Sequence, residues 1–91
     1  MALGIYFRPA GFTPEAYDTV IGKLEAAGVG QPEGRLYHAS MVVDGLIEVY
    51  DVWESQETFE AFGAVLVPIL NEVGSDPGEP MVVPVHNLIP G

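Results

Sequence analysis

The sequence predicts one small α+β domain in which strands and helices follow the order β-α-β-β-α-β. Three features predict this order: two stretches with helical apolar spacing and capping residues, an Asp-Gly pair between two alternating runs, and a further strand-like run near each end. The chain has 91 residues, which suffice for one domain and are too few for two. Residues 1–91 are therefore expected to form a single domain.

The first strand and the first helix are indicated by alternation and by capping residues. Residues 2–8 alternate between apolar and other side chains, as a strand with one buried face does. Thr13 supplies an N-cap hydroxyl, Pro14 suits the first helical position, and Glu15 lies near the positive end of the helix dipole. The helix is expected to close at Gly28, after an apolar stripe of Tyr17, Val20, Ile21 and Leu24.

A β-hairpin is predicted where residues 36–43 and 46–53 flank Asp44-Gly45, because Asp-Gly favours a two-residue hairpin turn. Such a turn also fixes the register of the two strands. The expected cross-strand pairs are Val43 with Leu46, Ser40 with Val49, His38 with Asp51, and Leu36 with Trp53.

A second helix and a last strand complete the predicted domain. Ser55 is the expected N-cap of the helix and Gly74 its end, while Pro68 predicts a kink or an early end. The last strand is expected over residues 81–89. Pro84 cannot donate a hydrogen bond, so this strand is expected at an edge of the sheet or beside a bulge. The whole order predicts a ferredoxin-like fold, a four-stranded antiparallel sheet with both helices on one face.

Both faces of the predicted hairpin are largely apolar, yet two helices can cover only one of them. We expect the face with Tyr37, Ala39, Met41, Tyr50 and Val52 to lie under the helices. The other face is then left for a second copy of the sheet, and closing the two sheets together gives a homodimeric α/β barrel.

The face expected to be open carries the candidate site. His38 lies opposite Asp51, with Ser40 nearby and the indole of Trp53 beside them, in an otherwise apolar surface. A carboxylate across from an imidazole orients one ring nitrogen and leaves the other to act as a base, so we assign catalytic roles to His38 and Asp51. A buried histidine also needs such a partner for purely structural reasons, and both interpretations stay open.

Four further side chains are assigned to substrate binding. Trp53 is either a core residue or a wall on which a ligand stacks, and Ser40 lies on the same face. Tyr6 extends the pocket if its side of the first strand faces the same interior, in which case Arg8 supplies a cation. His86, on the last strand, is the second imidazole of the chain.

Composition narrows the classes of partner. Three basic against thirteen acidic residues give a formal net charge of −10, which disfavours nucleic acid. The longest nearly apolar stretch, residues 61–70, is too short to span a bilayer, and the N-terminus does not resemble a signal peptide. The sequence has no cysteine and no metal-ligand spacing, so we expect a cytoplasmic protein without a metal site, and without a phosphate-binding glycine motif or other cofactor.

The segment Asp51-Val52-Trp53-Glu54-Ser55, followed by Phe59 and Phe62, resembles the strand-to-helix junction of the dimeric α/β barrel superfamily. That superfamily includes antibiotic biosynthesis monooxygenases and haem-degrading monooxygenases. Together with the histidine strand, the hairpin and the closing strand, the likeness extends over nearly the whole chain and is strongest to small members of the actinobacterial type whose function is not known.

The resemblance implies a monooxygenase that works without a cofactor. Haem-degrading members use a tryptophan that matches Trp53, an asparagine on the first strand and a histidine on the second helix. This sequence has Gly4 and Tyr6 on the first strand and no histidine in the second helix, which disfavours haem degradation. Quinone-forming oxygenases of the superfamily need mainly an apolar cavity with a few polar groups.

Three functions therefore compete. The first is a cofactor-independent monooxygenase, or a related proton-transfer catalyst, for a small aromatic or polyketide-like substrate. The second is a non-catalytic small-ligand-binding or stress-related dimer. The third is an interaction module whose polar groups only satisfy one another.

Overall fold

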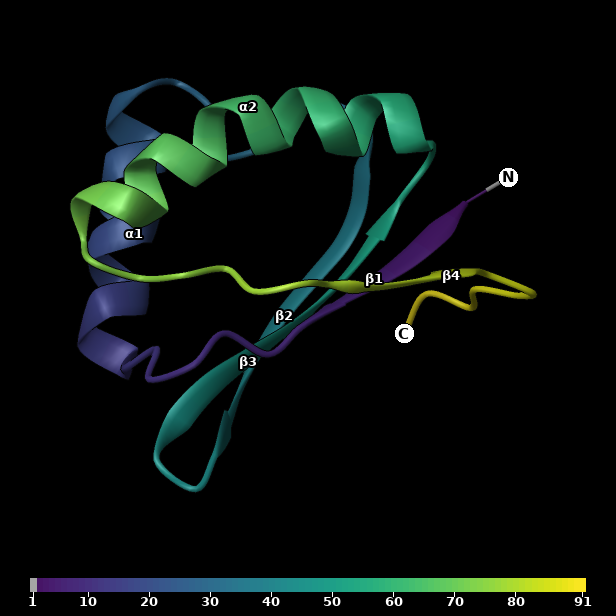
Figure 1. The fold of residues 1–91 in the computed structure, drawn as a ribbon. Coiled ribbons are helices and arrows are strands. Elements are labelled where there is room, and N and C mark those ends of the chain that lie inside the picture. The colour runs from purple at the N-terminus through teal and green to yellow at the C-terminus, as the bar shows by residue number, and fades with distance from the viewer. Residues whose placement is uncertain (1) are drawn as a thin grey trace.

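The computed structural model describes residues 2–91 as a four-stranded antiparallel sheet with two helices on one side (Figure 1). The strand order across the sheet is β2-β3-β1-β4. The elements are β1 (Leu3–Phe7), α1 (Pro14–Ala26), β2 (Arg35–Val43), β3 (Leu46–Trp53), α2 (Gln56–Glu72) and β4 (Met81–Pro84). This is the predicted ferredoxin-like arrangement, so the predicted fold class is confirmed.

The helix boundaries follow from the predicted caps. The Thr13 hydroxyl accepts a hydrogen bond from the backbone N–H of Ala16 at 3.1 Å, and Ser55 accepts from that of Thr58 at 3.2 Å. Of the kink or early end predicted at Pro68, the early end is wrong, because α2 continues to Glu72. Pro68 is exposed, whereas Ile69 and Leu70 are buried and hold the last turn against the core.

The hairpin has the predicted turn and, over most of its length, the predicted register. Asp44 and Gly45 have φ angles of 52° and 80°, the left-handed values of a two-residue hairpin turn. The pairs Val43 with Leu46, Ser40 with Val49, and His38 with Asp51 are confirmed. The pairing of Leu36 with Trp53 is wrong: the register shifts between Arg35 and Tyr37, and Arg35 lies opposite Trp53.

The last strand lies at the edge of the sheet, as the proline predicted, but it is shorter than residues 81–89. β4 ends at Pro84, which pairs with Leu3. The next residue, Val85, donates its backbone N–H to the carbonyl of Ala2 at 2.9 Å, and beyond it the chain forms no strand.

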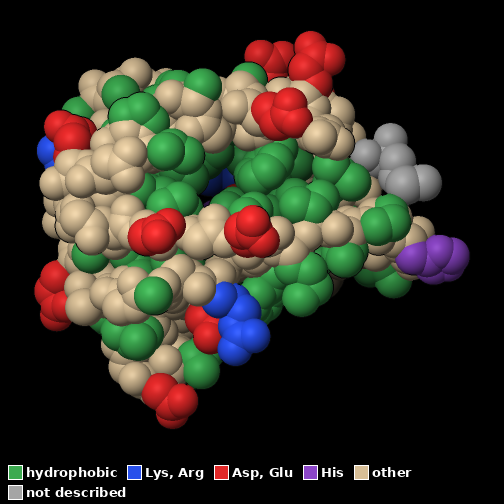
Figure 2. Space-filling view, viewed as in Figure 1, with side chains coloured by type: hydrophobic (Ala, Val, Ile, Leu, Met, Phe, Trp, Pro, Cys, Tyr) green, Lys and Arg blue, Asp and Glu red, His purple; other side chains and the backbone are tan. Residues whose placement is uncertain are grey.

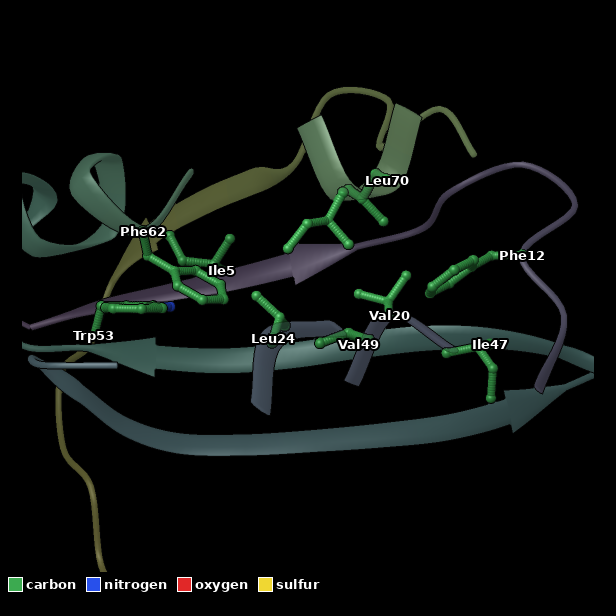
Figure 3. Packing of buried hydrophobic residues seen from close by; sticks show 10 residues of the cluster. Ile5, Phe12, Val20, Leu24, Ile47, Val49, Trp53, Phe62 and Leu70 are labelled. Atoms are coloured by element: carbon green, nitrogen blue, oxygen red, sulfur yellow. The ribbon is translucent and has the colours of Figure 1, made fainter. Parts of the chain in front are cut away.

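The two faces of the sheet are exchanged relative to the prediction. Ile5, Ile47, Val49 and Trp53 point toward the helices and form the core with Phe12, Val20, Leu24, Phe62 and Leu70 (Figure 3). We call this side of the sheet, which also carries His38 and Asp51, the covered face. We call the other side of the sheet the open face. It carries Tyr6, Tyr37, Met41, Val43, Leu46, Glu48, Tyr50, Met81 and Val83.

The cause of the exchange is the pairing of β1 with β3. β1 has its large apolar side chains on one side only, namely Leu3, Ile5 and Phe7. Because Ile5 pairs with Asp51, burial of the β1 apolar side carries Asp51 and its neighbour His38 under the helices.

Candidate functional site

An apolar cavity of about 60 Å³ lies between the covered face and the two helices. Figure 2 shows a hollow lined with hydrophobic side chains between α2 and the segment that leads to β4. Phe62, Leu66 and Leu70 line the cavity from α2, and Pro77 lines it from that segment. The polar side chains that line it come from three places: Tyr17 on α1, Arg35 and His38 on β2, and Asp51 on β3.

Four side chains form one continuous chain of hydrogen bonds beside this cavity. The Tyr17 hydroxyl lies 2.7 Å from Nε2 of His38, and Nδ1 of His38 lies 2.6 Å from Oδ1 of Asp51. The indole N–H of Trp53 donates to Oδ2 of Asp51 at 3.2 Å. The chain therefore runs from the cavity lining at Tyr17 to the buried indole of Trp53.

For a neutral His38, the hydrogen-bond partners determine which ring nitrogen carries the hydrogen. An ionised carboxylate only accepts, so Nδ1 of a neutral His38 carries the hydrogen that is donated to Asp51. Nε2 then has a free lone pair and accepts from the Tyr17 hydroxyl. This is the order hydroxyl, imidazole, carboxylate, in which the carboxylate orients the ring and the ring polarises the hydroxyl.

Burial strengthens the electrostatic interactions of this arrangement. Asp51 is only 3% exposed, whereas 22% of the His38 side chain is accessible. The backbone N–H of Tyr17 donates a hydrogen bond to the carbonyl of Thr13 at 3.0 Å. The rings of Tyr17 and His38 are stacked, with an angle of 6° between their planes. Within residues 2–91, every fully buried side-chain nitrogen or oxygen has a hydrogen-bond partner. The buried polar atoms of Tyr17, His38, Asp51 and Trp53 are thus paired with one another and need no ligand.

Of the six residues predicted for the site, two line the cavity and four do not. His38 and Asp51 line the cavity together. Trp53 is fully buried and reaches the site through its bond to Asp51, so it offers no exposed ring face for stacking. Ser40 is on the covered face of β2, but it is exposed and does not line the cavity.

Tyr6 and His86 lie away from the cavity. Tyr6 is on the open face, because it pairs with Tyr50, while its neighbour Ile5 points into the core. His86 is exposed beyond the end of β4. Tyr6 therefore does not extend the pocket, and Arg8 does not supply a cation to the pocket.

Two polar residues of the cavity, Tyr17 and Arg35, were not predicted from the sequence. Tyr17 belongs to the apolar stripe of α1 and gave no sign that its hydroxyl would meet a histidine from β2. Arg35 precedes the predicted start of the strand, and the bulge turns it toward the cavity. The available signal for Tyr17 was its polar hydroxyl on a buried helical face, where such a group requires a partner.

The open face carries a separate polar cluster. The Tyr6 hydroxyl donates to Oε1 of Glu48 at 2.6 Å, and Arg8 lies 3.5 Å from the other oxygen of this carboxylate. The hydrogen bond to Glu48 raises the pKa of Tyr6, desolvation and the Glu48 charge add to the rise, and the Arg8 charge opposes it. This cluster does not contact the cavity.

Residues 2–91 contain neither a cluster of metal ligands nor a helix that could cross a membrane. No three His, Asp or Glu side chains come together in the way that metal ligands would. No helix in this range has the length and apolar character needed to cross a membrane.

Comparison with known proteins identifies the fold. No protein-family model matches the sequence, and no curated protein matches it. Among solved structures, the chain is similar to SnoaB, a cofactor-independent oxygenase from Streptomyces nogalater, with a TM-score of 0.62 at 16% identity. A point variant of SnoaB gives 0.61 at 18% identity, and both alignments cover 99% of this chain and 96% of the other. This chain therefore shares the fold of SnoaB over 99% of its length.

Proposed function

We propose that this protein is a cofactor-independent monooxygenase that acts on a small aromatic or polyketide-like phenol. The observation that carries the proposal is the hydrogen-bonded sequence Tyr17, His38, Asp51, which ends at the lining of an apolar cavity. The similarity of fold to SnoaB supports the same class of reaction. We also propose the cytoplasm as its location, since the chain has no cysteine.

The proposed role of the site is to ionise the substrate. A phenolic O–H of the substrate gives its proton to the Tyr17 oxygen as the Tyr17 proton moves to Nε2 of His38. Asp51 stabilises the imidazolium that forms, and Trp53 holds Asp51 in place. The ionised phenol is electron-rich enough to react with O2 at its para carbon, giving a hydroperoxide that loses water to leave a quinone.

This reaction balances without an added reductant. Conversion of α-naphthol to the naphthoquinone removes two hydrogens and adds one oxygen atom. The second oxygen atom of O2 leaves as water with those two hydrogens. The protein supplies a base, a water-poor cavity and a fixed orientation, and these are the features of the covered face.

The size of the cavity sets a condition on the substrate. About 60 Å³ is less than the roughly 150 Å³ of an engineered apolar cavity that binds benzene. An aromatic ring therefore enters only if the hollow widens. Pro77 lies on its border, in the segment 75–80 that has no regular secondary structure, and movement of this segment is the expected route.

The test is oxygen uptake and quinone absorbance with α-naphthol, and with anthrone as a larger polyketide-like probe. We expect turnover by the wild type and a loss of about 100-fold to 10,000-fold in His38→Gln. His86→Gln is the matched control, because His86 is exposed and outside the cavity, and it should keep the wild-type rate. No turnover of either probe, or equal rates in the two variants, would refute the proposal.

A second candidate function is a non-catalytic small-ligand-binding or stress-related dimer. The complete pairing of buried polar groups favours it, because the site needs no substrate to satisfy its hydrogen bonds. A probe that binds the cavity and is recovered unaltered under oxygen would support this function over the first.

We propose that the chain forms a homodimer through the open face. Tyr37, Met41, Val43, Leu46, Met81 and Val83 are exposed there although they are apolar or aromatic. Tyr50 packs against Tyr6 and Tyr37 with ring centroids 6.2 and 6.4 Å away, which makes a continuous aromatic surface. The helices lie on the other side, so a second sheet is the simplest cover.

Native mass spectrometry tests the dimer and reports any retained ligand in the same measurement. We expect a dimer for the wild type and a monomer for Met41→Glu, which adds a charge to the open face directly opposite Glu48. A monomeric wild type would refute the dimer and leave the site in the covered face unaffected.

A further inference from the structure

Arg35 places a positive charge against the apolar cavity. It lies at the start of β2 opposite Trp53, and the register shift that follows it directs it to the covered face. Among residues 2–91, Arg35 is the only Lys or Arg that lines the cavity. Most of the other residues that line this cavity are apolar, among them Leu24, Phe62 and Leu66.

No carboxylate of residues 2–91 forms an ion pair with Arg35. Asp51, the buried carboxylate of the same cavity, uses its two oxygens for His38 and Trp53. Arg35 makes one side-chain hydrogen bond, to the carbonyl of Gly30 at 3.2 Å. A guanidinium has five N–H donors, so most of its hydrogen-bonding capacity is free.

A cation without a counter-charge in an apolar surface needs an explanation, because partial desolvation of the charge is unfavourable. The chain has only three Lys and Arg residues against thirteen acids. The single hydrogen bond to Gly30 uses no property that requires a positive charge. A bound anion would use both the charge and the free donors.

We propose that Arg35 is the anion-binding group of this cavity and that its ligand is an aromatic compound with an ionised oxygen. The ring would lie against the apolar lining and the oxygen on the guanidinium. In the β2–β3 ladder Arg35 pairs with Trp53 and His38 pairs with Asp51, and one pair, Tyr37 with Val52, separates them. Arg35 and His38 both line the cavity from β2, so the anion lies on the same side of the cavity as the base. The inference deepens the proposed function, and it rests on that function only for the identification of the ligand as a substrate.

The ionised oxygen can belong to a permanent carboxylate or to a phenol that loses its proton in the site. Benzoate and its neutral isostere benzamide test the first source. para-Nitrophenol tests the second, because its ionised form absorbs visible light and reports deprotonation directly. Binding of each probe is measured by NMR titration of the full chain, without any requirement for turnover.

We expect benzoate to bind at least about tenfold more tightly than benzamide, as a charge-assisted hydrogen bond to guanidinium allows. The preference is informative because a net charge of −10 disfavours anions elsewhere on the surface. Arg35→Gln should remove the preference and Arg35→Lys should keep part of it. Arg8→Gln, which removes the same charge beside Glu48 instead, should leave the preference intact.

The outcomes separate this inference from the proposed function. Equal binding of benzoate and benzamide, no binding of either, or an unchanged preference in Arg35→Gln would overturn the anion site, whatever the oxygen-uptake assay shows. A benzoate preference without turnover of α-naphthol or anthrone would support the anion site and refute the oxygenase. Coloured para-nitrophenolate formed on binding, and lost in Arg35→Gln, would support the second source of the anion.

Discussion

The two faces of the sheet carry similar sets of side chains in different surroundings. Each face has apolar positions interrupted by a charged or titratable side chain that is hydrogen-bonded to a tyrosine. Next to the covered face, Tyr17 of α1 bonds to His38, which bonds to Asp51, beside a cavity. On the open face Tyr6 bonds to Glu48, next to Arg8, and no helix lies above them.

The difference shows that burial and an adjacent space, rather than residue type, distinguish a candidate site from a surface cluster. Asp51 is 3% exposed, so its hydrogen bonds do not compete with water. Arg8 has 70% of its side chain accessible, so its interaction with Glu48 is screened by solvent. The same chemical groups can therefore orient a base on one face and contribute little on the other.

The largest effect that tests this difference is expected from two neighbouring residues of β3. Ile47 points into the core and Leu46 lies on the open face. We expect Ile47→Ala to lower the free energy of unfolding by about 2–5 kcal/mol. Leu46→Ala should lower it by less than about 1 kcal/mol in dilute solution, since it creates no internal cavity. Urea denaturation at several protein concentrations measures both, and equal losses would mean that the faces are assigned wrongly.

An intermediate effect is expected from the two carboxylates. Asp51→Asn replaces one acceptor oxygen by an N–H group facing either His38 or Trp53, both of which donate to Asp51. We expect a loss of about 1–3 kcal/mol in unfolding free energy, because a buried donor is left without a partner. Glu48→Gln still offers an oxygen to Tyr6 and should cost less than about 1 kcal/mol. A larger loss in Glu48→Gln would show that the open face is buried against a partner.

The sequence was sufficient for features that depend on local signals. Thr13, Ser55 and the Asp44-Gly45 turn predicted where elements begin and end, since capping and turn formation involve only a few neighbouring residues. The pairing of His38 with Asp51 followed from the turn, because a two-residue loop fixes the hairpin register.

Features that depend on distant parts of the chain were not predictable in the same way. The covered face was chosen wrongly because the choice depends on the pairing of Ile5 with Asp51, which are far apart in sequence. Tyr17 reaches His38 only when α1 packs on the sheet, and Arg35 faces the cavity only because of the bulge. The polar members of the site other than the hairpin pair are thus products of tertiary packing.

The smallest effect is expected from Tyr6 at alkaline pH. Its pKa is raised above the usual 10.0, mainly because the neutral phenol donates a hydrogen bond to Glu48. The resulting stabilisation is fully present below the pKa of the unfolded chain and is lost as the pH rises through the folded pKa. The ultraviolet titration of tyrosinate should therefore show one group above 10.0 in the wild type that is absent in Tyr6→Phe and shifted down in Glu48→Gln. An unchanged titration in Glu48→Gln would mean that water, rather than Glu48, determines the pKa of Tyr6, and that the open-face cluster is a chance contact of surface side chains.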